Sequence, residues 1–358
     1  MSENITLNRI PSLTWNWLRM NDVKVEMPLP VTGECPCEVT VPDGVAYEKE
    51  SAAFANDIKG GSGEAYAKLI EERIKETAVF SAAEGTNAEA PVVLKFRNEA
   101  GASTFNKFVI TAEENANITV VMSYTSDREA GGQAGFMTLL RAKRGARINL
   151  VQINTLGESY TLMNDVGAVA EDDAHISISH LFLGGSKVYQ GCNIDLKGRN
   201  AGVEEEIGYF LNKEQLLDMN YVVLHNGRTT DSGIRTNGVL SGNASKLFRG
   251  TIDFRNGCAG SKGSEIEEVI LRDDTVINKT IPVILCAEED VEGNHGATIG
   301  RLDEDLIFYL QSRGLEEEEI YKLIANSRLA SFCRRIPDEN VRKETFEYFS
   351  EGRVKENE

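Results

Sequence analysis

The sequence contains no apolar run that approaches the about 18 residues of a membrane-spanning helix. Its start, MSENITLNRI, also lacks the apolar segment that follows a basic start in a secretory signal peptide. We therefore expect neither a transmembrane span nor a secretory signal, and we expect the protein in the cytoplasm. With 41% hydrophobic and 26% charged residues, the composition is that of an ordinary globular protein.

Basic residues are scarce relative to acidic ones. The chain has 38 Lys and Arg against 56 Asp and Glu, which gives a net charge of -18, and no block of Lys or Arg stands out. A field of this sign repels phosphate backbones and anionic lipid, so we expect neither nucleic acid nor a membrane as a partner. The acidity could favour a basic protein partner or metal cations, and it could equally serve solubility alone.

Cysteines are few, and they are scattered over the chain. In a long chain without a secretory signal, this distribution favours reduced thiols over a disulfide framework. Cys258, between glycines, is expected to be an accessible loop thiol, either a spectator or a site for metal or persulfide. Cys286 follows an apolar run and is expected in the core. The others are Cys35, Cys37, Cys192 and Cys333, of which the first two form a C-x-C pair that is a weak metal signal.

Several catalytic motifs are missing. The sequence has no G-x-x-x-x-G-K-[ST] loop, no G-x-S-x-G elbow, no H-E-x-x-H and no dinucleotide fingerprint placed after a strand. We therefore expect a protein that does not hydrolyse ATP and that acts through ligands and partners.

The part of the chain from residue 91 to about 286 has a repeated pattern. Short runs of alternating apolar and polar residues follow a turn residue and an alanine, and the marked alanines are 30, 28 and 27 residues apart. Strand plus turn at a nearly fixed interval is typical of a solenoid. A sandwich of antiparallel strands gives similar runs, so the spacing alone leaves both open. The marked pairs are Asn115-Ala116, Gly145-Ala146, Asp173-Ala174 and Asn200-Ala201.

Helical periodicity is found at both ends of the chain. We predict a helix over 63–77 and a short one within 11–20, where Leu13 and Trp17 are four apart. After residue 298 we predict helices over 302–313 and 316–326 and a last helix that carries Val341, Tyr348 and Phe349, packed on the end of the solenoid. The chain is thus divided into a mixed, helical N-terminal region (1–90), a β core (91–290) and a helical C-terminal region (291–358).

His295 is the first candidate site residue. It lies between Asn294 and Gly296 in a segment that we predict to be a turn before a helix. Neutral imidazole is a good ligand for iron. Capping of the following helix, or a hydrogen bond to a nearby carbonyl, is the alternative role.

The run from His295 to Gly314, H-G-A-T-x-G-x-L-D-E-x-x-x-F-Y-L-x-x-R-G, resembles the signature of the SufB/SufD family of iron-sulfur cluster assembly proteins. The resemblance continues upstream through 246–252 and 225–240 and covers roughly the last 140 residues well. It implies a mainly β protein with a right-handed parallel β-helix between helical ends, which decides against the sandwich.

The resemblance also implies a non-catalytic scaffold on which an iron-sulfur cluster is assembled transiently, with no tightly bound cofactor. His295 matches the histidine implicated in building the cluster. Gly293 stands where the SufD type often has a cysteine, and Gly296 replaces the glutamate of the SufB type, so the chain is nearer to SufD. Glu267 or Glu268 could ligate iron in place of a thiolate, with a solvated strand face as the alternative; Cys258 is a further candidate.

By the same resemblance, the partners are an ABC-type ATPase and either a second copy or a SufB-like subunit. The ATPase is expected at the helices 302–313 and 316–326, and the dimer contact at about 226–285. Two alternatives remain: a β-helix carbohydrate-active enzyme and a metal-free docking partner. The expected docking residues, which could instead pack the helices onto the solenoid, are Phe308, Tyr309, Arg313 and Tyr321.

Overall fold

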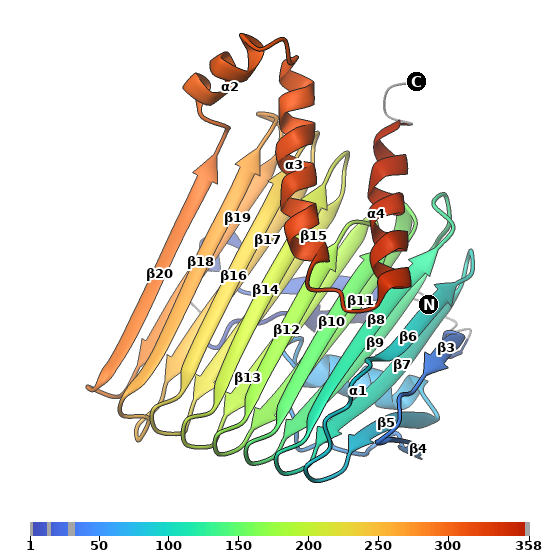
Figure 1. The fold of residues 1–358 in the computed structure, drawn as a ribbon, viewed down its shortest axis with the longest axis vertical. Helices are drawn as coiled ribbons and strands as arrows, with labels where there is room; N and C mark the ends of the chain where they lie inside the picture. The colour runs from blue at the N-terminus through green and yellow to red at the C-terminus, as the bar shows by residue number, and fades with distance from the viewer. Residues whose placement is uncertain (1–2, 13–15, 28–32, 355–358) are drawn as a thin grey trace.

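The computed structural model describes residues 3–12, 16–27 and 33–354. Two nine-stranded sheets face each other, and each turn of the chain adds one strand to each sheet (Figure 1). Successive strands within each sheet are parallel, apart from one short antiparallel strand at the N-terminal end of each. The expected parallel β-solenoid with helices at both ends is confirmed, and the antiparallel sandwich is excluded.

The strands extend beyond the expected limits of 91 and 290. The first sheet contains, from its last strand backwards, β20 (Val291–Gly300), β18 (Ser261–Leu271), β16 (Asp231–Leu240), β14 (Gly202–Leu211), β12 (His175–Phe182), β10 (Arg147–Thr155), β8 (Asn117–Ser126), β6 (Val92–Asn98) and β3 (Cys37–Thr40). The second contains β19 (Ile277–Cys286), β17 (Ser245–Phe254), β15 (Leu216–His225), β13 (Lys187–Leu196), β11 (Ser159–Ala170), β9 (Gly131–Ala142), β7 (Ser103–Ala112), β5 (Glu76–Ala82) and β4 (Val45–Ser51).

The alanine-marked turns have a common backbone conformation. Asn115, Gly145, Asp173 and Asn200 have φ between 54° and 66°, the left-handed region that Asn, Asp and Gly adopt most readily. Each following alanine is at most 1% exposed and belongs to the interior core. The spacing in the sequence therefore reports one corner of the solenoid, where the chain turns sharply and only a small side chain fits inside.

Inward-facing side chains stack on their counterparts in the next coil. Val120, Leu150 and Ile178 occupy the same register position on three neighbouring strands and are fully buried. Burial of each such side chain contributes roughly 1.5–3 kcal/mol. Because every coil buries its apolar face only against its neighbours, a coil at the end of the stack has one side without a partner.

Helices α3 (Glu317–Cys333) and α4 (Glu339–Val354) lie across the outer face of the first sheet (Figure 1). They pack there on outward apolar residues such as Val121, Val151 and Leu181. The expectation that they cover the end of the solenoid was wrong, because their apolar residues pack against the apolar residues that the first sheet turns outwards. Helix α2 (Glu304–Gln311) follows β20 and has no buried residue. Among the described residues, no helix is long and apolar enough to span a membrane.

The N-terminal segment covers the outer face of the second sheet. It consists of β1 (Glu3–Leu7), β2 (Val23–Met27), a 3-10 helix (Asn16–Leu18) and α1 (Glu64–Arg73). Of these, β1, β2 and α1 share an apolar cluster with strands of that sheet. The helix predicted over 63–77 is therefore present but shorter, because β5 begins at Glu76. The helix predicted within 11–20 is reduced to the 3-10 turn; Leu13 and Trp15 lie outside the described residues.

A buried ion pair fixes this segment to the solenoid. Arg249 on β17 donates to both carboxylate oxygens of Asp218 on β15, at 2.7 and 3.1 Å. Asn8 donates to the same carboxylate at 2.7 Å, and the Arg249 Nε donates to the carbonyl of Met20 at 2.6 Å. One guanidinium thus holds two turns of the solenoid and the N-terminal segment together.

Removal of Arg249 should be strongly destabilising. Arg249→Ala leaves the buried Asp218 carboxylate without its counter-charge, and we expect a loss of about 3–5 kcal/mol in the free energy of unfolding, measured by urea denaturation. Arg97→Ala is the matched control, since Arg97 and its partner Asp127 have side chains 79% and 83% exposed; it should cost about 0–1 kcal/mol. Equal losses for the two variants would contradict the role of the buried pair.

Candidate functional site

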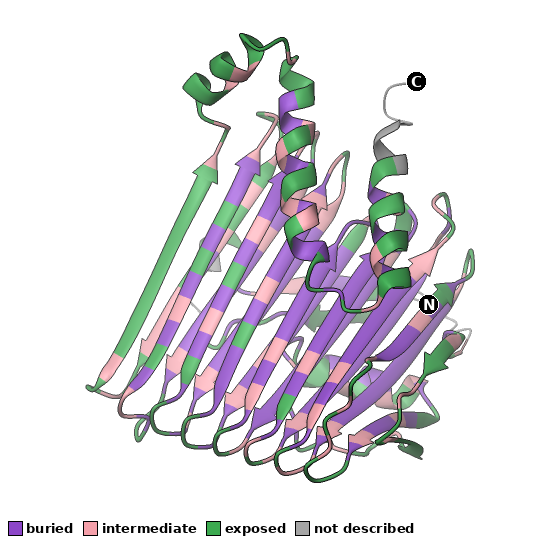
Figure 2. Ribbon diagram, in the orientation of Figure 1, coloured by how far each residue is buried: buried purple, intermediate pink, exposed green. Residues whose placement is uncertain are grey.

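The last coil of the solenoid is open. Strands β20 and β19 stand at the ends of their sheets, so each has one edge of backbone groups without a neighbouring strand. Almost every residue of β20 is exposed (Figure 2). The last three strands also carry exposed isoleucines, Ile266, Ile277 and Ile299. A long edge strand with exposed apolar residues is a template for pairing with another chain.

His295 lies on this edge strand, so its expected place in a turn was wrong. It is in register with Glu265 of β18, and residues in register on parallel strands point to the same face. Glu265 faces the interior of the solenoid. The imidazole therefore stands on the inner side of the last coil, where it is exposed because no further coil covers it.

Glu267 is buried, so neither a solvated strand face nor an open ligand position describes it. Its carboxylate forms an ion pair with Lys246, and both side chains are at most 1% exposed. Thr280 of β19 donates to the same carboxylate at 2.7 Å and accepts from Lys246 at 2.9 Å. The sequence alone does not reveal that Glu267 faces inwards, because its neighbour Ile266 is apolar and yet faces outwards, as Glu268 does.

Glu265 is the second buried carboxyl of the coil. Burial, followed by the nearby charge of Glu267, raises the pKa of Glu265 to about 8. Burial lowers the pKa of Lys246, against the attraction of Glu267. The Glu265 carboxyl lies against Gly250, where an added Cβ would stand 2.1 Å from its Oε2 atom. With Glu265 protonated at neutral pH, the interior of this coil holds one balanced ion pair.

The two cysteines of this region exchange their expected roles. Cys258 is fully buried with Ile252 and Phe254, and burial raises its pKa, so it is not the accessible thiol that we predicted. Cys286, expected in the core, is exposed and donates to the Glu288 carbonyl at 3.1 Å. It is in register with the buried Phe254, but β19 has no further strand beyond it. Its exposure follows from its place on the last coil, which the apolar run before it could not reveal.

No group of three or more His, Cys, Asp or Glu side chains that could hold a metal ion occurs in the described part of the chain. The three candidate ligands are therefore not brought together. His295 is on the open inner side of β20, Cys258 is buried beside Ile252 and Phe254, and Glu267 is paired with Lys246.

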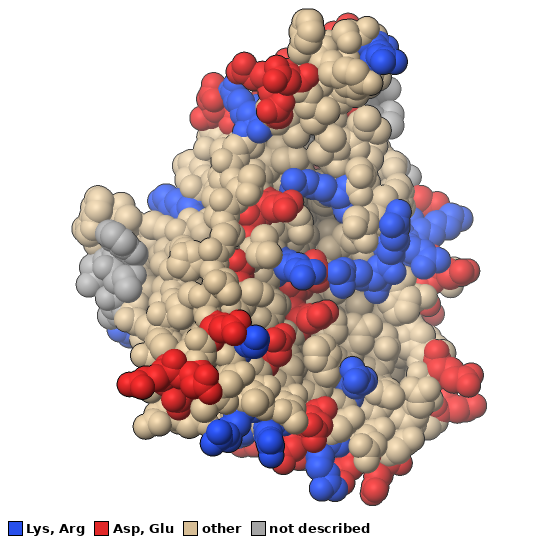
Figure 3. Space-filling view, turned by 60° about the vertical axis from the view of Figure 1, so that its left-hand side comes forward, with Lys and Arg blue, Asp and Glu red and all other residues tan. Residues whose placement is uncertain are grey.

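Helix α2 and the turn after it present three of the expected docking residues. Phe308 and Tyr309 are 73% and 53% exposed, and the Arg313 guanidinium lies 5.1 Å from the centroid of the Tyr309 ring. Asp303 caps the helix by accepting from the backbone N–H of Leu306 at 3.0 Å. Tyr321 differs, since it is buried between α3 and the first sheet. In the view that turns the last strands forward, α2 projects at the top and uncharged residues form most of the surface (Figure 3).

The fold and this edge define a β-solenoid protein whose last coil is an exposed end, with a histidine on its inner side and a projecting helix beyond it. Residues 96–328, more than half of the chain, match the SufBD core domain of the SUF system for FeS cluster assembly. The chain belongs to this family.

Two bacterial relatives are named SufD. The chain is 24% identical over 260 residues to the iron-sulfur cluster assembly protein SufD of Bacillus subtilis, which covers 72% of this chain and 59% of that protein. It is 24% identical over 234 residues to SufD of Escherichia coli, with 64% and 55% covered. A chloroplastic SufBD family protein of Arabidopsis thaliana, ABCI8, is 23% identical over 268 residues, with 71% and 47% covered. The chain spans about half the length of the curated relatives it matches.

The raised pKa of Glu265 makes stability dependent on pH. In the folded protein the Glu265 carboxyl keeps its proton up to about pH 8, whereas the ordinary pKa of a Glu carboxyl is 4.5. The protonated Glu265 therefore makes its full contribution to the free energy of unfolding below pH 4.5, and this contribution is lost as the pH rises towards 8. Between pH 5 and 8, we expect the free energy of unfolding of Glu265→Gln to fall less than that of the unmodified chain. At pH 8, we expect this variant to be about 1–3 kcal/mol more stable than the unmodified chain.

Urea denaturation of both proteins at several pH values checks this expectation. Glu268→Gln is the matched control, because Glu268 lies three residues away on the same strand but is exposed. The control should keep the slope of the unmodified chain. If Glu265→Gln also keeps that slope, Glu265 is not the titrating group.

Proposed function

We propose that this chain is a non-catalytic scaffold subunit of a Suf-type iron-sulfur cluster assembly machine. The observation that carries the proposal is the open last coil, which combines a long unpaired sheet edge with the exposed His295 in a chain of the SufBD core family. The scaffold pairs with a second copy or with a SufB-like subunit through this coil, and it binds an ABC-type ATPase through α2.

Pairing at the last coil follows from the energetics of sheet edges. Strands β19 and β20 each offer ten residues with one free edge, and a strand from a partner would satisfy those backbone groups. The exposed isoleucines of the last three strands would be buried in the same contact. The contact proposed from the sequence, 226–285, is thereby extended through β20.

His295 would then stand near the boundary between the two chains. A single exposed imidazole on an open edge suits a cluster whose other ligands come from the partner, and neutral imidazole binds iron well. Cys286 is the exposed thiol of the same coil and could supply a further ligand or carry sulfur. The cluster is the cargo of the assembly and leaves it for a recipient protein.

Docking of the ATPase at α2 rests on the exposure of its aromatic side chains. Two large rings on a short helix, with an arginine just beyond its end, are side chains of the kinds enriched at the centres of interfaces. Because α2 follows β20 directly, movement of a bound ATPase would be transmitted to the last coil. Tyr321, being buried, is left out of this proposal.

The role of His295 is tested by anaerobic reconstitution with ferrous iron and sulfide, in the presence of the SufB-like partner, with the visible absorbance of the cluster as readout. We expect His295→Ala to lose most of that absorbance while circular dichroism remains unchanged, since the side chain is exposed. His175→Ala is the control, because His175 is partly exposed on β12, far from the last coil. Equal cluster formation in all three proteins would exclude His295 as a ligand.

The docking of the ATPase is tested by calorimetry with the ABC-type ATPase of the same system. Phe308→Ala should weaken binding about tenfold or more, because truncation of a central aromatic residue removes more than about 1–2 kcal/mol. Phe346→Ala on α4 is the matched control, since that ring is also exposed, at 39%. An unchanged affinity of the Phe308 variant, with the fold intact, would place the docking site elsewhere.

A further inference from the structure

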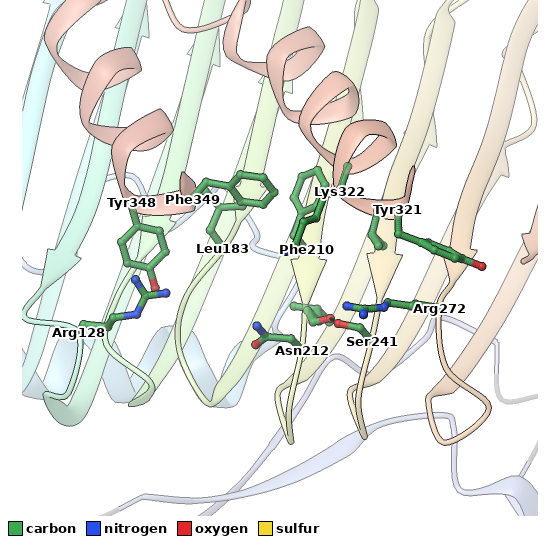
Figure 4. Close-up of a pocket in the computed structure, with 13 residues that line it drawn as sticks. Arg128, Leu183, Phe210, Asn212, Ser241, Arg272, Tyr321, Lys322, Tyr348 and Phe349 are labelled. Atoms are coloured by element: carbon green, nitrogen blue, oxygen red, sulfur yellow. Dashed lines mark hydrogen bonds between the residues drawn. The ribbon is translucent and has the colours of Figure 1, made fainter. Parts of the chain in front are cut away.

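A pocket lies where helices α3 and α4 meet the ends of the strands of the first sheet (Figure 4). Its volume is about 80 Å³. In a cavity volume of this kind, one water molecule takes up roughly 10–15 Å³. The pocket therefore holds roughly five to eight water molecules, or a part of a ligand of similar size.

The charges that line this pocket are unusual for this protein. Three lining residues are cationic, namely Arg128, Arg272 and Lys322, and no lining residue is acidic, although acidic residues exceed basic ones 56 to 38 in the whole chain. The three come from separate elements: the turn between β8 and β9, the turn between β18 and β19, and α3. The fold therefore gathers positive charge here from distant parts of the sequence.

The cations differ in how far they are neutralised. Arg128 contacts Glu158 at 3.4 Å and lies 5.1 Å from the centroid of the Tyr348 ring. Lys322 is paired with Glu318 on its own helix at 2.9 Å. Arg272 forms no ion pair with any of the described residues and influences Glu318 only at longer range. The end of the pocket beside Arg272 therefore keeps the most positive charge.

The floor of the pocket is apolar. Phe210 and Phe349 pack edge to face there, with their ring centroids 4.8 Å apart, and Leu183 lies beside them. Figure 4 shows Arg128 at one end beneath Tyr348 and Arg272 at the other end beneath Lys322. A ligand that fits this arrangement has a negatively charged group for the Arg272 end and a small apolar body for the aromatic floor.

We propose that this pocket binds a small organic anion, a carboxylate or a phosphate monoester with a compact apolar body, through charge-assisted hydrogen bonds from Arg272 and Lys322. Such a ligand contacts α3, α4 and two strand turns at once. Binding therefore stabilises the attachment of both helices to the solenoid.

The test is calorimetric titration of the full chain with three probes: phenyl phosphate, phenylacetate and the uncharged benzyl alcohol. We expect saturable binding of one molecule of at least one of the two anions with a Kd below about 10 mM, weakened by added salt, and no comparable binding of benzyl alcohol. Binding of phenyl phosphate alone or of phenylacetate alone identifies which anionic group the pocket takes.

Substitutions locate the site. Arg272→Gln and Lys322→Gln should each raise the Kd about tenfold or more, since each removes a charge-assisted hydrogen bond. Arg97→Gln, an exposed arginine outside the pocket, should leave the Kd unchanged. The proposal is overturned if neither anion saturates, if benzyl alcohol binds equally well, or if the Arg97 variant weakens binding as much as the pocket variants do. Thermal denaturation of each variant shows whether it is folded. If one of the two pocket variants does not fold, the other one still tests the proposal.

Discussion

The backbone hydrogen bonds between successive coils are the constraint on which this structure depends. Each strand is satisfied only by the strands of the coils before and after it, so a stack of coils has two ends. The N-terminal end finishes in β3 and β4, which pair antiparallel with the first parallel strands and have only four and seven residues. The C-terminal end is different, since β19 and β20 each have ten residues and α3 and α4 pack on the outer face instead of over the end. Both ends of the solenoid thus carry a free sheet edge, and the edge at the C-terminal end is the longer one.

The interior near the open end contains several buried charged or titratable side chains. The Lys246–Glu267 pair and the protonated Glu265 lie within the last coils, and Glu205, further back, is also buried with a pKa raised to about 8 by burial. Replacement of such pairs by apolar residues is often neutral or stabilising, so the presence of the pair is not by itself evidence of a more stable fold. At the open end they lie beside the strand that carries His295. Glu265, with its raised pKa, is expected to make stability depend on pH.

The repeat of the solenoid can be read from the sequence because it is a local property, but its spacing left the antiparallel sandwich open, and the family resemblance decided between the two. A residue in the left-handed conformation followed by a buried alanine, as at Asn115-Ala116 or Asp173-Ala174, can be read from spacing and residue type. The expectation that His295 is a site residue follows from its signature, but its place on a strand does not, because an exposed edge strand lacks the apolar alternation by which strands are recognised. Its structure comes from register with β18, a contact with a different part of the chain.

Burial at the end of the stack was the property that sequence reasoning could not supply. Cys286 has an apolar neighbourhood and is exposed, whereas Cys258 sits between glycines and is buried. Glu267 has charged neighbours and faces inwards, and Tyr321 lies against the sheet while Phe308 and Tyr309 do not. In each case the outcome depends on whether a further coil or helix covers that position. Local composition does not contain this information, because the covering element lies elsewhere in the chain or is absent at the last coil.

The most direct test of the account is hydrogen–deuterium exchange of the β20 amides, measured for the chain at low concentration and again in complex with its partner or with a second copy. The account predicts that amides in residues 291–300 exchange rapidly in the single chain and become protected on pairing, while the interior strands β10 and β12 change little. A stable complex in which β20 keeps its rapid exchange would contradict the central claim that the open coil is the pairing edge.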